Sequence, residues 1–107
     1  MPSLAVKRDP KRAPTHPGFL LADTVIPATG KTKSEIARLL GISRQQLYAI
    51  LDERAPVSPA VAVRLGKLFG NGPDIWVRMQ GAYDTWQAVR QLAAAIKKIP
   101  TLKATAA

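Results

Sequence analysis

The sequence contains no cysteine, and this absence removes several kinds of chemistry at once. Without thiols, the 107-residue chain can form no disulfide bond, no thiolate metal site and no cysteine nucleophile. It has a single histidine and only 7 acidic residues, which are scattered along the chain. Metal sites and acid–base catalysis need such groups to converge. We therefore predict a protein that is not an enzyme and that uses no metal ion and no cofactor.

Long apolar runs and nucleotide-binding motifs are also absent. No window approaches the roughly 20 apolar residues of a membrane helix, and no apolar stretch follows the basic residues near the N-terminus, as a signal peptide would require. The sequence has no phosphate-binding loop and no dinucleotide fingerprint. It predicts a soluble intracellular protein with no membrane partner and no small-molecule substrate.

Positive charge is what the chain has in excess. The 16 Lys and Arg residues outnumber the 7 Asp and Glu residues, so the formal net charge is +9 and the sequence pI is near 10.5. This balance favours a polyanionic partner, which could be nucleic acid, an anionic membrane surface or an acidic protein. Hydrophobic residues make up 47 % of the chain, which is enough for one modest core.

The chain divides into three parts. Residues 1–16 contain three prolines and four basic residues without helical spacing, so we predict a flexible basic N-terminal arm. Such an arm either follows DNA phosphates or serves only as a solubilising tail, and the sequence does not choose between these roles. Residues 17–99 form the predicted folded domain, and residues 100–107 form a predicted disordered tail.

Apolar spacing and turn residues predict five helices and no strand, which makes the expected fold class all-α. The expected helices cover about residues 17–27, 32–41, 43–51, 58–70 and 73–99. Capping pairs begin the second and third helices, at Thr32 with Glu35 and at Ser43 with Gln46. The predicted inward-facing residues of the first four helices are Phe19, Leu20, Ala22, Val25 and Ile26, then Ile36, Leu39 and Leu40, then Leu47, Ile50 and Leu51, then Val61, Ala62, Leu65, Leu68 and Phe69.

The second and third predicted helices, joined by a tight turn at Gly41 and Ile42, have the pattern of a helix-turn-helix. In that motif the apolar back of the second helix holds its first turn in the major groove, where Arg suits guanine and Gln suits adenine. The predicted base contacts are Arg44, Gln45, Gln46, Tyr48 and Ala49, and the predicted phosphate contacts are Lys33, Ser43, Arg54 and Lys31. A helical hairpin with a merely soluble face would show the same local pattern.

The last predicted helix carries an apolar stripe. Its members recur at spacings of three and four residues and are Ile75, Met79, Ala82, Trp86, Val89, Ala93 and Ile96, with Trp76 and Tyr83 beside them. A chain of this size has little surface with which to cover so wide a face, and uncovered apolar faces mark partner sites. We therefore predict a homodimer formed through Trp76, Met79, Tyr83 and Trp86. The alternative is that Trp76 and Trp86 close the core of the single chain.

Residues 16–87 resemble the HigA antitoxins, a branch of the Xre-type helix-turn-helix proteins. The matching landmarks are HPG at 16–18, ARLLGISRQQLYAIL, PVSPAVAVRLGKLFG and DIWVRMQGAYDTWQA. The last two are the specific ones, because they fit the patterns SP-x-x-A-x-RL-x-K-x-F-G and W-x-x-x-Q-x-x-YD-x-W-x-A. The resemblance covers about two-thirds of the chain.

The resemblance implies a homodimeric five-helix protein of lambda-repressor-like fold that represses its own operon from operator DNA. It also implies a RelE-like messenger-RNA-cleaving toxin as partner and a bacterial cytoplasm, at the nucleoid, as location. The family's DNA-contacting positions fall on Lys33, Ser43, Arg44, Gln45 and Gln46. The chain departs from the family pattern in a first helix with Asp23 as its only acid and in its basic arm. A stand-alone Xre-type regulator, or an interaction module that no longer reads DNA, remains open beside the antitoxin.

Overall fold

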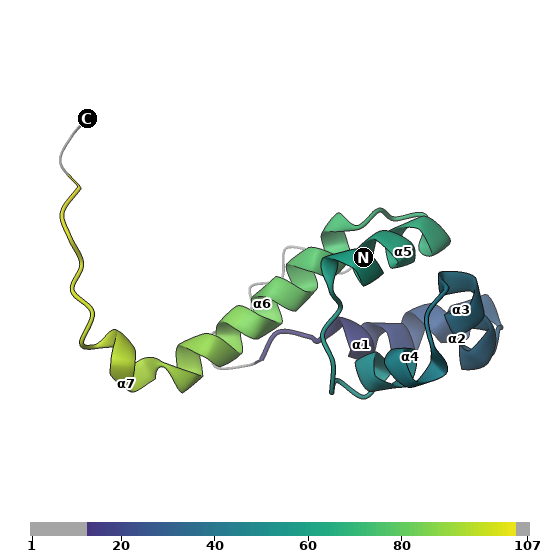
Figure 1. Ribbon diagram of the computed structural model, residues 1–107, viewed down its shortest axis with the longest axis horizontal. Coiled ribbons are helices and arrows are strands. Elements are labelled where there is room, and N and C mark those ends of the chain that lie inside the picture. The colour runs from purple at the N-terminus through teal and green to yellow at the C-terminus, as the bar shows by residue number, and fades with distance from the viewer. Residues whose placement is uncertain (1–12, 105–107) are drawn as a thin grey trace, which may run out of the picture.

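The computed structural model describes residues 13–104, and every regular element in that range is helical (Figure 1). The elements are α1 (Pro17–Leu20), the π-helix η1 (Leu21–Val25), α2 (Ile26–Thr29), α3 (Lys33–Leu40), α4 (Arg44–Leu51), α5 (Pro59–Phe69), α6 (Asp74–Gln91) and α7 (Ala93–Ile96). The all-α prediction is confirmed. Most of the predicted basic arm, residues 1–12, lies outside the described residues, as does the end of the predicted tail, residues 105–107.

The first predicted helix corresponds to α1, η1 and α2, which follow one another without a break. It was expected to end near Pro27 but continues to Thr29 and ends at Gly30, whose φ is +71°. A wide turn precedes the proline, because the backbone N–H of Ile26 donates to the carbonyl of Leu21, five residues back. In a regular α-helix, a proline ring clashes with the carbonyl oxygen four residues earlier. The wider π turn before Pro27 alters the backbone geometry where this clash would occur.

The predicted inner face of the first segment is wrong only at Phe19, because Ile26 is buried and Leu20, Ala22 and Val25 pack against the core. Phe19 is 53 % exposed, whereas Leu21 is completely buried. The reason is a close contact between backbones: a Cβ atom added to Gly18 would lie 1.8 Å from the carbonyl oxygen of Ile50 in α4. Because Gly18 therefore faces α4, Leu21, one turn later, faces the core and Phe19 points to the side.

The core lies between α3, α4, α5 and the first segment. Its buried hydrophobic residues are Leu21, Ile26, Ile36, Ala37, Leu40, Leu47, Ile50, Leu51, Val57, Val61, Ala62, Leu65 and Trp76. The predicted inner face of α3 was wrong at Leu39, which is 44 % exposed, while the small Ala37 is buried in its place. A small side chain lets the neighbouring helices approach α3 closely, so the buried face turns toward Ala37.

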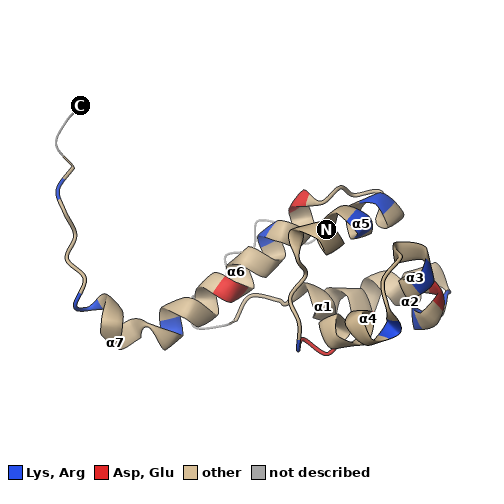
Figure 2. Cartoon of the chain, viewed as in Figure 1, with Lys and Arg blue, Asp and Glu red and all other residues tan. Residues whose placement is uncertain are grey.

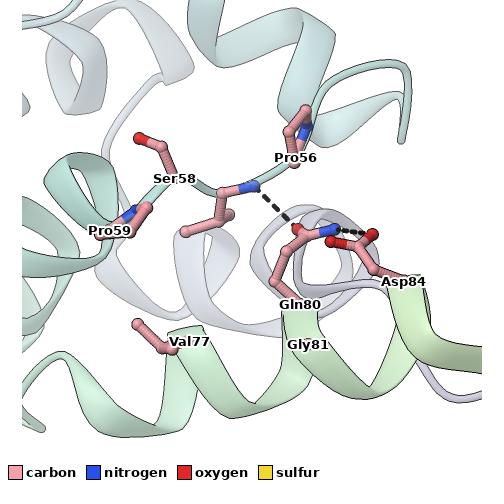
Figure 3. Close-up of a pocket in the computed structure, with 8 residues that line it drawn as sticks. Pro56, Ser58, Pro59, Val77, Gln80, Gly81 and Asp84 are labelled. Carbon is pink, nitrogen blue, oxygen red and sulfur yellow. Dashed lines mark hydrogen bonds between the residues drawn. The ribbon is translucent and has the colours of Figure 1, made fainter.

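A buried glutamine joins α6 to the loop between α4 and α5 (Figure 3). The Oε1 atom of Gln80 accepts a 2.8 Å hydrogen bond from the backbone N–H of Val57, and its Nε2 atom donates to Asp84 at 2.9 Å. On the same helix, the indole N–H of Trp76 donates a 3.2 Å hydrogen bond to the side-chain oxygen of Asn71. Asp84 thus orients the amide of Gln80, so that α6 holds the chain that leaves the C-terminal end of α4.

The end of α6 projects away from the other helices (Figure 1). The sequence predicted a helix to about Ile99, but α6 ends at Gln91 and Leu92 leaves the helical conformation with φ −100° and ψ 12°. The short α7 follows, and every described residue from Gln91 to the end is exposed. Nothing in the contacts of this segment explains the break at Leu92.

Candidate nucleic-acid interface

The turn between α3 and α4 is held by backbone and side-chain contacts. Gly41 has a φ of +74°, and the N–H of Ile42 donates to the carbonyl of Ala37 at 3.1 Å. Arg64, on α5, donates from Nη1 to the carbonyl of Leu40 at 2.8 Å. A Cβ atom at residue 41 would come within 2.7 Å of the same Nη1 atom and would displace the end of Arg64, but the positive φ is the main reason for glycine here. The angle at which α4 leaves α3 is therefore fixed.

Ser43 caps α4, and its hydroxyl oxygen accepts from the backbone N–H of Gln46 at 3.0 Å. The predicted capping box is only half formed here, because the Gln46 side chain makes no hydrogen bond to any residue of the described part of the chain. The full capping box is present one helix earlier, at Thr32 and Glu35. The Gln46 amide therefore stays in solvent, where it can reach a ligand.

The first turn of α4 presents long hydrogen-bonding side chains to solvent. Arg44, Gln45 and Gln46 are exposed, and the other side of the helix is buried in the core through Leu47, Ile50 and Leu51. Tyr48 is 39 % exposed, whereas Ala49 is half-buried. A helix anchored on one face, with free guanidinium and amide groups at its N-terminal turn, has the geometry needed to read base edges in a major groove.

The predicted phosphate contacts surround this turn. Lys31 and Lys33 are exposed at the N-terminal end of α3, and the Ser43 hydroxyl can still donate although its oxygen is used in the cap. Figure 2 shows basic segments on both α3 and α4, at the end of the molecule opposite α7. Arg54 is different, because it pairs with Asp52 at 3.3 Å on the surface. An exposed pair of this kind is weak enough for a phosphate to replace it.

The four predicted dimerisation residues do not share one environment. Trp76 is completely buried within the chain, so it contributes to the core that the alternative interpretation required. Tyr83 packs edge-on against the His16 ring, with centroids 4.9 Å apart. Met79 and Trp86 are half-buried, and the Arg90 guanidinium lies 4.8 Å from the centre of the Trp86 ring. On α6, the part of the stripe that a partner could reach is therefore Ile75, Met79, Ala82, Trp86 and Val89, and Ala93 and Ile96 beyond α6 are exposed as well.

His16 is a structural residue that begins the first helix. It is buried, and its Nδ1 atom accepts a 2.9 Å hydrogen bond from the backbone N–H of Gly18. Burial lowers the pKa of His16, and this effect outweighs the opposing influence of the nearby Glu53 and Asp84 carboxylates. The residues between 13 and 104 bring no three metal-ligating side chains together. In the same range no helix has both the length and the apolar character of a membrane span.

Sequence reasoning from local patterns missed the roles of Arg64 and Gln80. Both positions belong to the patterns that carry the family resemblance, RL-x-K and W-x-x-x-Q, but those patterns give no contact partner. The partners are the Leu40 carbonyl and the Val57 N–H, which lie 24 and 23 residues away in the chain. The presence of Arg64 and Gln80 in the family patterns was the only sign in the sequence that they matter. The structure explains their presence by these two hydrogen bonds.

The sequence of the chain is similar to those of known bacterial regulators and antitoxins. No protein-family model matches the chain. The uncharacterized HTH-type transcriptional regulator YbaQ of Escherichia coli K12 is 30 % identical over 76 residues, which cover 71 % of this chain and 67 % of that protein. Antitoxin HigA-1 of Vibrio cholerae is 29 % identical over 79 residues, 74 % of each chain.

Similar solved structures match a larger share of this chain than these two sequences do. An addiction module antidote protein of the HigA family from Coxiella burnetii superimposes with a TM-score of 0.77 at 30 % identity, over 86 % of this chain and all of that one. The chain belongs to the HigA family of helix-turn-helix antitoxins. Antitoxin GraA in complex with its operator has a TM-score of 0.80 at 30 % identity, over 92 % of this chain and 99 % of that chain. These similar proteins are named as regulators and antitoxins, and none of them is named as an enzyme.

Proposed function

We propose that this chain is a sequence-specific DNA-binding repressor, the antitoxin of a HigBA-type toxin–antitoxin pair that also represses its own operon. The observation that carries the proposal is the first turn of α4, where Arg44 and Gln45 are exposed on a helix whose opposite face is buried. A similar antitoxin is known in complex with its operator, which supports the same use of this fold here. No catalytic step is part of the proposal, and the protein acts in the bacterial cytoplasm.

In the proposed complex, α4 enters the major groove. Arg44 donates to guanine O6 and N7, and Gln45 and Gln46 reach adenine N6 and N7. Tyr48 and Ala49 lie further along α4, where they contact a thymine methyl group or the backbone. Lys33, Ser43, Arg54 and Lys31 contact phosphates and set the register of α4 without reading bases. A homodimer formed through the C-terminal stripe would place two such helices about 34 Å apart on one face of DNA.

Selection of bound duplexes from a random pool, followed by gel shifts, tests this proposal directly. The wild-type chain should enrich one inverted repeat. Arg44→Ala and Gln45→Ala should each weaken specific binding by about 1–3 kcal/mol and relax preference at one base pair. Arg38→Ala, an exposed change on α3 outside the predicted contacts, is the matched control and should keep the preference. Unchanged affinity and preference after the Arg44→Ala and Gln45→Ala changes together would refute the assignment of α4.

A stand-alone regulator without a toxin is the second candidate. The observation in its favour is the charge of +9, because a basic RelE-like toxin would find little electrostatic complementarity on such a chain. One of the similar proteins is also named only as a transcriptional regulator. Co-expression of the chain with the product of the adjoining reading frame decides between the two. Rescue of growth and a stable complex support the antitoxin, whereas an inert neighbour supports the stand-alone regulator.

A further inference from the structure

Three aliphatic side chains from three helices are exposed next to one another on the outer side of α5. Leu39 on α3 is 44 % exposed, Val63 on α5 is 59 % exposed and Val77 on α6 is 45 % exposed. Isolated exposed aliphatic residues are ordinary, but contiguous ones mark binding surfaces. We call Leu39, Val63 and Val77, together with the cations Lys67 and Arg78, the outer strip.

Adjacent hollows make the outer strip continuous. A hollow of about 330 Å³ is lined by both Leu39 and Val63, and a second, of about 430 Å³, is lined by Val63 and Val77. A third, of about 390 Å³, shares Pro59 and Val77 with the second and extends to Gln80 (Figure 3). Successive hollows of this kind suit the anchors of an amphipathic helix, which recur every three or four residues.

The charge beside the first two hollows is mainly positive. Arg64 and Lys67 line the first, and Arg78 lines the second together with the carboxylate of Asp74. The third is lined by the carboxylate of Asp84, which accepts a hydrogen bond from Gln80. Between residues 13 and 104 the only ion pair is the one between Arg54 and Asp52, so Lys67 and Arg78 have no carboxylate partner in that range. Two unpaired cations next to an apolar floor complement a segment that is apolar on one side and acidic on its flanks.

We propose that the outer strip is a docking surface for an acidic amphipathic helix of a partner protein. DNA is a poor occupant, because phosphates would leave Leu39, Val63 and Val77 without apolar contacts. A second copy of the chain is also a poor occupant, because its own outer strip would bring identical cations together. The acidic helix alone satisfies both the apolar floor and the cationic flank.

The outer strip and the DNA-reading turn belong to different parts of the fold. The main contacts of α4 are with α1 and α3, whereas those of α5 are with α3 and α6. The strip lies on exposed residues of α3, α5 and α6 and includes no residue of α4. The docking surface therefore does not depend on DNA binding, and failure of one proposal would leave the other standing.

A designed peptide provides a defined probe. The full chain, labelled with ¹⁵N, is titrated with a synthetic helix of about 18 residues that has leucine on one face and glutamate on the other. The expected result is saturable chemical-shift change centred on Leu39, Val63 and Val77. The same peptide with lysine in place of glutamate should bind at least about tenfold more weakly. Absence of binding, or changes centred on α4, would overturn the proposal.

Two substitutions that introduce the same charge separate this surface from the rest of the molecule. Val63→Asp should weaken binding of the glutamate peptide by at least about tenfold, since it places a carboxylate in the apolar floor. Leu102→Asp, at a residue 84 % exposed beyond α7, should leave peptide binding unchanged. Equal effects of the two changes would overturn the proposal, as would a Val63→Asp chain that loses its dimeric mass, because the occupant would then be a second copy.

Discussion

At the scale of single residues, His16 connects the start of the chain's first helix to α6. Its Nδ1 atom accepts from the N–H of Gly18, and its ring meets the edge of Tyr83. The hydrogen bond requires a neutral imidazole, because a protonated ring has no acceptor nitrogen. Burial lowers the pKa of His16 and so favours the same neutral form. One buried side chain therefore makes the stability of the N-terminal segment depend on pH.

Stability should fall in mild acid because of His16. The folded-state pKa lies below the ordinary value of about 6.5, so the unfolded chain binds a proton first. The contribution of His16 is complete above that ordinary value and is lost as pH falls through the lower folded-state pKa. Loss of the cap should cost about 1 kcal/mol. Urea denaturation between about pH 8 and about pH 5 measures the change in the free energy of unfolding.

His16→Asn is the control for this prediction. Asparagine can still cap the helix but does not titrate in this range. The variant should keep its stability near neutral pH and lose the part of the pH dependence that lies just below the ordinary histidine pKa. A wild-type chain and a variant with parallel pH profiles would show that His16 does not control the transition.

The residues that could be predicted from the sequence are those whose roles depend on near neighbours. The caps at Thr32 and Ser43 use partners three residues away. The outward direction of Arg44 and Gln45 follows from the spacing of the apolar residues behind them. Arg64 and Gln80 bind backbone groups more than twenty residues away, and no local pattern contains that information.

At the scale of elements, Arg64 holds the helix-turn-helix together from a third helix. Arg64→Met keeps the length of the side chain and removes the hydrogen bond to the Leu40 carbonyl. A hydrogen bond from a charged donor contributes about 1.5–3 kcal/mol, and partial exposure should bring the loss to the lower end of that range. Denaturation of the variant in urea measures this loss. Arg38→Met, an exposed change on α3, is the control and should cost much less. Equal losses of unfolding free energy in the two variants would contradict a stabilising role for the hydrogen bond between Arg64 and the Leu40 carbonyl.

The helix boundaries were predictable where a residue type enforces them. Gly41 and Gly70 take positive φ values and end helical segments, as the sequence predicted, whereas Gly30 ends the first segment later than predicted. The π turn before Pro27 and the break at Leu92 were not predictable, because hydrophobic spacing does not record either one. The exposure of Leu39 was missed for a related reason. Spacing alone allows two adjacent faces on so short a helix, and tertiary packing selects the one that contains Ala37.

At the scale of the whole molecule, the C-terminal stripe is the feature that a single chain leaves incomplete. Ile75 and Val89 remain 43 % and 54 % exposed along α6, although Trp76 on the same helix is completely buried. The 18 residues of α6 extend for about 27 Å. A helix of that length pairing with its copy would cover the half-buried Met79 and Trp86. Dimerisation thus remains our prediction for this face, with Trp76 assigned to the core.

Val89→Asp should convert the dimer to a monomer, because a pair of related carboxylates would face each other in an apolar contact. Sedimentation equilibrium should give half the wild-type mass with unchanged helical content. Binding to a duplex with two half-sites should weaken, and the slope of log affinity against log salt should fall to about half, since each lost phosphate contact removes about 0.9 from that slope. Leu102→Asp introduces the same charge at a residue 84 % exposed beyond α7 and should change neither mass nor slope. A Val89→Asp chain that keeps the wild-type mass and slope would place the dimer contact elsewhere on the molecule.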